Sequence, residues 1–147
     1  MPTRAEETRK KMMKAKVSLV KETSEKERRK NEATHELRTV GVSEWVKFEV
    51  QKIVAKADKV AQEEGAGEIE ILLPRDEFGY YDILRSKYYD TLGQFDIGSI
   101  IPDVHKLIIL SLRASGYKVT DPEDKEFPHE YDGMPGVDRR KIIVVSW

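Results

Sequence analysis

Charged residues dominate the first forty positions of the chain, and apolar residues are scarce there. From residue 4 to about residue 38 the sequence has no Gly or Pro and is rich in Ala, Met, Lys, Glu and Arg, which all favour helix. Thr3 and Glu6 form a capping-box pattern, in which each side chain can accept a hydrogen bond from the other residue's backbone N–H. The pattern therefore predicts one long charged helix that begins just after Thr3.

The few apolar residues of this helix form one cluster. Met13, Val17 and Val20 recur at i, i+4 and i+7, so they lie on one helix face that can dock through about two turns. Two interpretations stay open, a solvated charged helix or an arm that becomes ordered against a partner. On the second interpretation the partner-binding residues are Met12, Met13, Val17, Leu19 and Val20.

From residue 41 the pattern changes to that of a packed domain. Apolar residues recur at three- and four-residue steps, which predicts an amphipathic helix over residues 44–64 with Ser43 as its N-cap. Alternation over residues 68–73, directly before Pro74, predicts a strand. We therefore divide the chain into a charged helical arm, residues 1–40, and a compact α+β domain, residues 41–147.

The remaining apolar segments predict two helices and two strands. After a turn at residues 75–79, helical spacing predicts a short helix up to Leu92, and an apolar run after Pro102 predicts a buried helix. Residues 117–120 and 141–147 read as strands that pair antiparallel, and the first strand could lie parallel beside the second. The polar residues 121–138 are expected to form a loop.

These elements define the fold class. We predict an α+β protein with a small three-stranded sheet covered by helices, preceded by a long charged N-terminal helical arm.

Composition adds a contrast in charge. The 147 residues carry a net charge of -1. Residues 1–40 hold twelve Lys/Arg and seven Asp/Glu, whereas residues 41–147 hold fourteen and twenty, so arm and body have opposite signs. The absence of Cys excludes disulfides, thiol nucleophiles and thiolate metal sites. No apolar run approaches the ~20 residues of a membrane span, so we expect a protein that does not enter a membrane.

No motif of known chemistry occurs in the sequence. It has no phosphate-binding loop, no Gly-x-Gly-x-x-Gly, no His-Glu-x-x-His and no Gly-x-Ser-x-Gly, and its histidines, His35, His105 and His129, are far apart. The acidic residues of 121–138 do not match the spacing of a calcium loop. We therefore expect no enzyme activity and no cofactor, and we keep a metal-dependent enzyme at 121–138 as an alternative.

Two further groups of residues are candidates for binding. Tyrosines and Phe95 concentrate around the short helix, and large amphipathic rings are common in contact surfaces, although one ring of each adjacent pair could instead fill the core. Basic residues of the arm could bind nucleic acid, but glutamates interrupt them and no aromatic residue is interleaved. The candidates are Tyr80, Tyr81, Tyr88 and Tyr89 for a protein partner, and Arg9, Lys10, Lys11, Lys14, Arg28, Arg29 and Lys30 for nucleic acid.

The second half of the chain resembles a known pattern. Residues 112–120 end in Gly-Tyr-Lys-Val-Thr, a variable polar segment follows, and the chain closes on Ile-Val-Val-Ser-Trp, after an Ala-Gly-Glu-Ile-Glu-Ile strand at residues 66–71. This arrangement is similar to that of small, mostly uncharacterised proteins encoded by tailed bacteriophages. The resemblance covers about residues 46–147, excludes the arm, and implies an origin without implying catalytic residues.

These observations lead to one expected function and two alternatives. We expect a non-enzymatic phage protein, a virion component or a host-takeover factor, that acts through protein–protein contact in the host cytoplasm or the virion. Its partner would be a phage protein, a host protein or another copy of itself. The alternatives are a nucleic-acid-binding accessory protein that uses the basic arm, and the metal-dependent enzyme.

Overall fold

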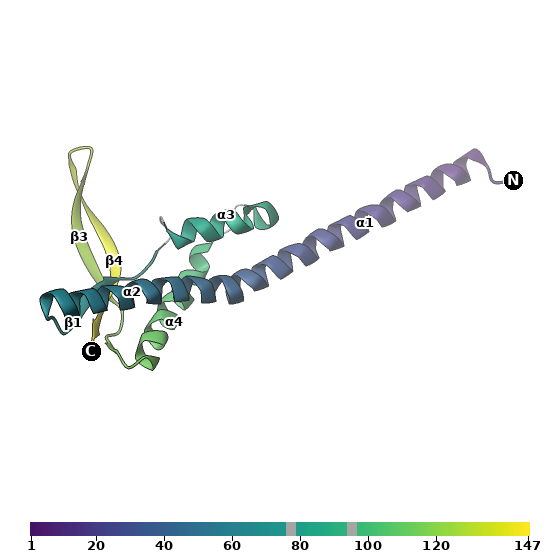
Figure 1. Ribbon diagram of the computed structural model, residues 1–147. Helices are drawn as coiled ribbons and strands as arrows, with labels where there is room; N and C mark the ends of the chain where they lie inside the picture. Colours follow the sequence, from purple (N-terminus) through teal and green to yellow (C-terminus); the bar gives the residue numbers. More distant parts are fainter. Residues whose placement is uncertain (76–78, 94–96) are drawn as a thin grey trace.

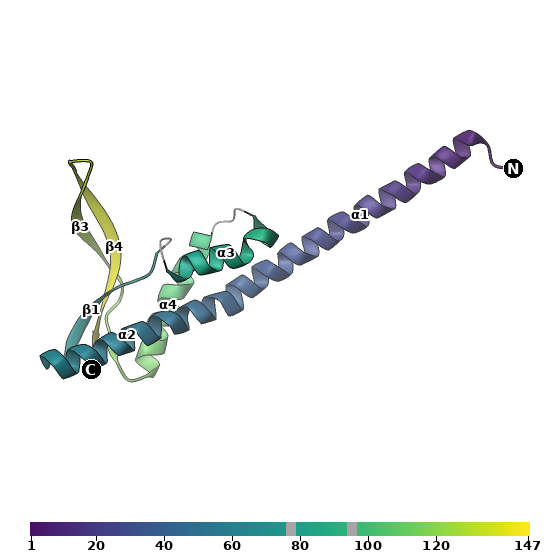
Figure 2. The same cartoon turned by 45° about the horizontal axis from the view of Figure 1, so that its top comes forward.

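A computed structural model describes residues 1–75, 79–93 and 97–147. Its main feature is a long helical rod, made of α1 (Arg4–Glu36), a π-helical turn (Leu37–Gly41) and α2 (Val42–Glu64). Figures 1 and 2 show the N-terminal part of α1 extending away from every other element, while α2 lies among them. The predicted capping box is confirmed, because the Glu6 N–H donates to Thr3 Oγ1 at 3.3 Å and the Thr3 N–H donates to Glu6 Oε2 at 3.2 Å.

The helix does not end at Gly41. The backbone there is helical, with φ of -60°, so the prediction that Ser43 caps a new helix is wrong. A Cβ on Gly41 would lie 3.2 Å from Leu37 Cδ1 and 3.4 Å from Leu84 Cδ2 of α3 (Tyr80–Leu92). The wide π turn keeps Leu37, Gly41 and Trp45 on the body side at four-residue steps. Glycine serves here for close packing and does not break the helix.

The other predicted elements are present. α2 ends at Gly65, which has a left-handed φ of 63°. The strand β1 (Glu68–Leu72) and the helix α4 (Ile101–Ala114), which follows a short 3-10 turn (Ile97–Ile100), agree with the predictions, and so does β2 (Lys118–Val119). Residues 76–78 of the predicted turn and Phe95 lie outside the described residues.

The sheet is antiparallel throughout and is organised around β4 (Met134–Ser146). β1 pairs with β4 over residues 142–146, and β2 pairs with the end of β4, which confirms the predicted antiparallel pairing of those two strands. The suggestion that the first strand lies parallel beside the second is wrong, because both pair with β4. A fourth strand, β3 (Glu123–Tyr131), pairs with β4 as well.

The expected loop at residues 121–138 is instead most of a long β-hairpin. β3 and the first half of β4 are joined by Asp132 and Gly133, whose φ values of 49° and 76° are those of a two-residue hairpin turn. Figures 1 and 2 show this hairpin extending beyond the rest of the sheet. Opposite charges face each other across the paired strands, with Arg139 3.0 Å from Glu126 and Lys141 3.4 Å from Asp124, so this polar sequence is compatible with strand pairing.

The hydrophobic core lies between α2, α4 and the sheet. It includes the fully buried side chains of Trp45, Ile108, Leu112 and Ile143. Ala33 is the first residue along the chain that belongs to it. The rod therefore enters the body about one turn before the π turn. Among the described residues, no helix is long and apolar enough to cross a membrane.

Candidate functional site on the N-terminal arm

The candidate site is the part of α1 that precedes the core, residues 4–32, which we call the outer arm. Every one of these residues is exposed. The outer arm spans roughly 40 Å at 1.5 Å per residue. Its five larger apolar side chains are the predicted partner-binding residues, and they remain 48% to 65% exposed: Met12, Met13, Val17, Leu19 and Val20.

These apolar side chains form two rows. Met13, Val17 and Val20 make the predicted row, and Met12 and Leu19 make a second one together with Ala15, which the sequence analysis did not single out. At about 100° per residue, the rows are centred roughly 130° apart around the helix axis. Two apolar rows are typical of a helix that contacts two neighbouring elements, or the walls of one groove. The i+3 and i+7 spacing from Met12 to Ala15 and Leu19 could have identified the second row.

The positive charge of the arm is concentrated beside the apolar rows. Residues 8–21, which we call the basic segment, hold six Lys/Arg and no Asp/Glu. Residues 22–40 hold five of each. Arg9, Lys10, Lys11 and Lys14 therefore lie in the basic segment, whereas the other predicted nucleic-acid contacts lie in the balanced half: Arg28, Arg29 and Lys30.

Ion pairs occupy part of that balanced half. Arg28 contacts Glu25 at 2.6 Å and Glu32 at 3.0 Å, and Arg29 lies 3.5 Å from Glu25. The hydrogen bond from the Arg28 guanidinium lowers the pKa of Glu25 below its ordinary value, and the charge of Arg28 acts in the same direction. These pairs support the helix along one side. Arg28 is accordingly less suited to a phosphate than the basic segment is.

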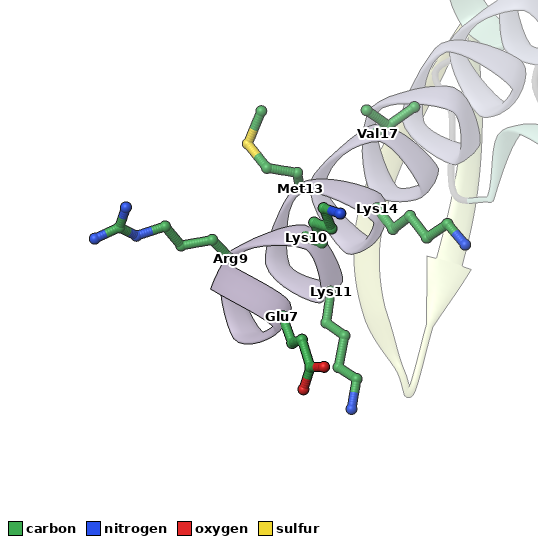
Figure 3. Close-up of a pocket in the computed structure, with 7 residues that line it drawn as sticks. All are labelled: Glu7, Arg9, Lys10, Lys11, Met13, Lys14 and Val17. Atoms are coloured by element: carbon green, nitrogen blue, oxygen red, sulfur yellow. The ribbon is translucent and has the colours of Figure 1, made fainter. Parts of the chain in front are cut away.

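A shallow hollow on the surface follows the basic segment. It has a volume of about 730 Å³ and is lined only by α1, including Met13, Val17 and Lys14. Figure 3 shows Met13 and Val17 projecting from one side of the helix and Lys11 and Lys14 from another. A single helix cannot enclose a ligand, so we interpret this hollow as the space between long side chains on an open face. A partner would have to supply the opposite wall.

Three of the four candidate tyrosines hold α3 against the rod. Tyr88 is buried, and its hydroxyl donates to Glu36 at 3.1 Å. Burial, followed by this hydrogen bond, raises the pKa of Tyr88 to about 12. The Tyr80 hydroxyl donates to Glu44 at 3.0 Å, and burial is again the main cause of its raised pKa.

The rings of these tyrosines also contact α2. Tyr80 stacks on Trp45 with centroids 6.4 Å apart, and Tyr81 meets the same indole edge-on at 6.3 Å. Tyr89, by contrast, is 52% exposed. Of the four tyrosines predicted as a contact surface, Tyr89 is therefore the one whose side chain is largely open to a partner, and Tyr80, Tyr81 and Tyr88 are engaged within the chain.

The histidines are not brought together. His35 is exposed on α1, and His129 lies on the hairpin. His105 on α4 lies against the Pro74 carbonyl oxygen, and burial lowers its pKa. Within residues 1–75, 79–93 and 97–147, no group of three or more His, Asp or Glu is arranged to hold a metal ion.

Comparison with known proteins gives no family for this chain. No protein-family model matches it, and neither a curated protein nor a solved structure does. The function must therefore be argued from the arm itself.

Proposed function

We propose that this chain is a non-enzymatic protein that acts by protein–protein contact, and that the outer arm is the contact element. The observation that carries the proposal is the row of apolar side chains left about half exposed on a helix that extends away from the body. We also propose, from the sequence resemblance, a phage origin and a place in the virion or the host cytoplasm. The partner would be a phage protein, a host protein or a second copy.

The energetics of an isolated helix support this role. Helices in proteins are stabilised mainly by packing of an apolar face, and the outer arm has no buried residue. Full burial of one aliphatic side chain contributes about 1.5–3 kcal/mol. A partner that covers both rows would therefore stabilise the arm and gain affinity from the same contact.

The charge distribution indicates which surfaces of two copies could come into contact. Two arms lying tip to tip would bring six cationic residues of each basic segment together, which is unfavourable. An arm against the body of another copy would instead pair opposite net charges, about +5 against -6. If the partner is a second copy, the contact is therefore expected to be arm to body.

The proposal is tested by two neighbouring substitutions of equal charge. Val17→Glu places a carboxylate on the predicted apolar row, and Ser18→Glu places one on the polar face one residue later. Each full-length variant serves as bait in lysate of phage-infected bacteria, and binding of the purified captured protein is then titrated. We expect Val17→Glu to weaken binding at least about tenfold, which corresponds to 1.4 kcal/mol. We expect Ser18→Glu to bind as the original chain does.

Two results would contradict the proposal. One is equal binding by both variants, because the apolar row would then make no contribution. The other is equal loss in both variants, since that would indicate general charge repulsion. Sedimentation of the chain alone separates self-association from binding to another protein.

A second candidate function is nucleic-acid binding by the basic segment. The six Lys/Arg of residues 8–21, with no carboxylate among them, favour it. It predicts binding that weakens steeply as the salt concentration rises, because Lys and Arg side chains that contact phosphates displace the counterions condensed on the nucleic acid. Filter retention of DNA and RNA at two salt concentrations tests it. Lys10→Gln with Lys14→Gln should reduce the salt dependence, whereas absence of retention at low salt would eliminate this candidate.

A further inference from the structure

The outward side of α3 carries exposed apolar and acidic residues together. It consists of five exposed residues, which we call the α3 face: Asp82, Ile83, Ser86, Tyr89 and Asp90. Ile83 and Tyr89 are 55% and 52% exposed. At about 100° per residue they lie roughly 120° apart around the helix axis, with the other three residues between them. The α3 face is opposite Leu84 and Tyr88, the buried residues of this helix.

The carboxylates of the α3 face are available to a cationic partner. Asp82 and Asp90 have no ion pair within the described part of the chain. Both line a hollow of about 360 Å³, together with Arg85 on one flank of the face. On the other flank, Lys87 lies 3.7 Å from Glu36 of α1.

The basic segment of the arm has the complementary arrangement. Arg9 and Lys16 are exposed, lie between its two apolar rows, and have no ion pair with any described residue. Figure 3 shows Arg9 projecting on the same side of the helix as Met13, away from Lys14. Apolar residues thus flank two cations on the arm and two carboxylates on the α3 face.

The spacing of these charges also matches. Arg9 and Lys16 are seven residues apart, which is about 10.5 Å along the helix axis. Asp82 and Asp90 are eight residues apart, which is about 12 Å. When the two helices lie side by side, each carboxylate can therefore face one cation.

Two other exposed surfaces of the body suit the basic segment less well. A groove of about 580 Å³ between α2 and α4 has apolar residues in its lining, but the charged residues there are cations, Arg38 and Lys47. Near the hairpin turn, Met134 and Val137 are three residues apart in β4, so their side chains point to opposite faces of the strand. Charge and geometry therefore both favour the α3 face.

We propose that the basic segment packs along the α3 face of a second copy of this chain. Its two central cations face Asp82 and Asp90, and its apolar rows cover Ile83 and Tyr89. The inference rests on the proposed function, since it names the partner and the surface that the arm contacts. About four turns of helix on each side make a small contact, so association occurs only at protein concentrations well above those of unfolding experiments. Because arm and face are different surfaces, further copies can add head to tail.

Sedimentation velocity of the full-length chain alone is the first test. We expect the average sedimentation coefficient to rise with protein concentration, and the association to weaken as salt is added. A chain that stays monomeric at every concentration would overturn the inference. The proposed function would be unaffected by that result, since it is decided by the comparison of Val17→Glu with Ser18→Glu in binding a captured protein.

Two charge-reversed chains test the surfaces themselves. One carries Asp82→Lys and Asp90→Lys, and the other carries Arg9→Asp and Lys16→Asp. We expect each chain alone to associate at least about tenfold more weakly than the original. An equimolar mixture should associate again, because the unaltered arm of one chain meets the unaltered face of the other, and the two reversed surfaces also have opposite charges. Circular dichroism checks that both variants fold before they are mixed.

The control reverses two exposed carboxylates elsewhere on the body. Asp58→Lys with Glu63→Lys, both on α2, changes the net charge by the same amount as the reversal of the α3 face. We expect the control to associate as the original chain does. Equal loss in the control and in the α3 variant would overturn the proposal, and so would a mixture of the two reversed chains that stays monomeric. Undiminished association of the arm variant alone would overturn it as well, and this result does not depend on the folding of an altered α3.

Discussion

Two elements extend from the body of this protein, the outer arm and the β3–β4 hairpin. They differ in how many of their side chains are paired within the chain and how many are left exposed. In the hairpin, several charges are paired across its strands or with β1, as Lys125 Nζ is with Glu70 at 2.9 Å, and two large apolar side chains near the turn, Met134 and Val137, are 70% and 58% exposed. The outer arm has apolar rows open to solvent and a basic segment without carboxylates. The hairpin thus pairs more of its charges within the chain than the basic segment of the arm does, and it exposes fewer large apolar side chains than the arm.

The difference indicates where a partner would contribute most. The free edge of β3 carries Pro128 and several charges, features that discourage a further strand from adding to a sheet. A partner on the hairpin would have to displace ion pairs that already exist. A partner on the outer arm would cover five large exposed apolar side chains, against two on the hairpin, so we expect the arm to be the more favourable contact element.

The strongest test of this contrast uses one substitution at two positions of the rod. Leu19 and Leu37 lie about five turns apart on the same face, but Leu19 is 62% exposed and Leu37 is 4% exposed. Leu37→Ala should lower the free energy of unfolding by about 2–5 kcal/mol. Leu19→Ala should change it by less than about 0.5 kcal/mol. Urea unfolding followed by circular dichroism measures both.

A large effect of Leu19→Ala would contradict the contrast, because it would mean that the outer arm packs on the body or on another copy. Truncation gives the same comparison at larger scale. Removing residues 1–21 should leave the body's stability unchanged, whereas removing residues 1–40 also removes Ala33 and Leu37 from the core and should destabilise it.

The sequence predicted the outer arm well and the hairpin poorly, for a physical reason. Helix propensity and the capping box are local properties, so the arm could be predicted residue by residue. The hairpin depends on partners across its two strands, and Pro128 and Pro135 make its sequence look like a loop. The Asp132-Gly133 pair between Tyr131 and Met134 was the local signal for a hairpin turn.

The candidate site was predicted in part. The apolar rows of the arm could be found from spacing alone. Which of the tyrosines are buried could not be predicted from spacing, because their burial depends on how closely α3 approaches the rod. Gly41 permits that approach, and the sequence analysis interpreted it as a helix boundary instead.

The next largest effect is expected where α3 contacts the C-terminal end of α1. Burial, followed by the hydrogen bond to Glu36, raises the pKa of Tyr88 to about 12, against an unfolded value near 10. The stability that the neutral phenol contributes is therefore fully present below about pH 10 and is lost as pH rises through about 12. Tyr88→Phe should cost about 1–2 kcal/mol at neutral pH. It should also flatten the loss of stability between about pH 10 and pH 12. Urea unfolding across that range tests both points, and an unchanged slope would contradict the assignment.

A smaller effect is expected in the hairpin. The pKa of Asp138 is lowered, and the hydrogen bonds that Arg75 donates to its carboxylate are the largest cause. The contribution of this pair is therefore present above the unfolded carboxyl value near 4 and is lost as pH falls through the lower folded value. Asp138→Asn should reduce the difference in stability between about pH 7 and about pH 3. The exposed neighbour substitution Asp132→Asn, at the hairpin turn, is the control and should preserve that difference.

The smallest effect is expected at the far end of the arm, where it tests whether the outer arm and the body unfold separately. Thr3→Ala removes the hydroxyl of the capping box and should destabilise the first turns of α1 by about 1 kcal/mol. Amide hydrogen exchange of those turns should accelerate, while urea unfolding of the body stays the same. If the midpoint of global unfolding moved by a comparable amount, the rod would unfold as one cooperative unit. The arm would then be stabilised through the body without a partner, and the contrast with the hairpin would fail.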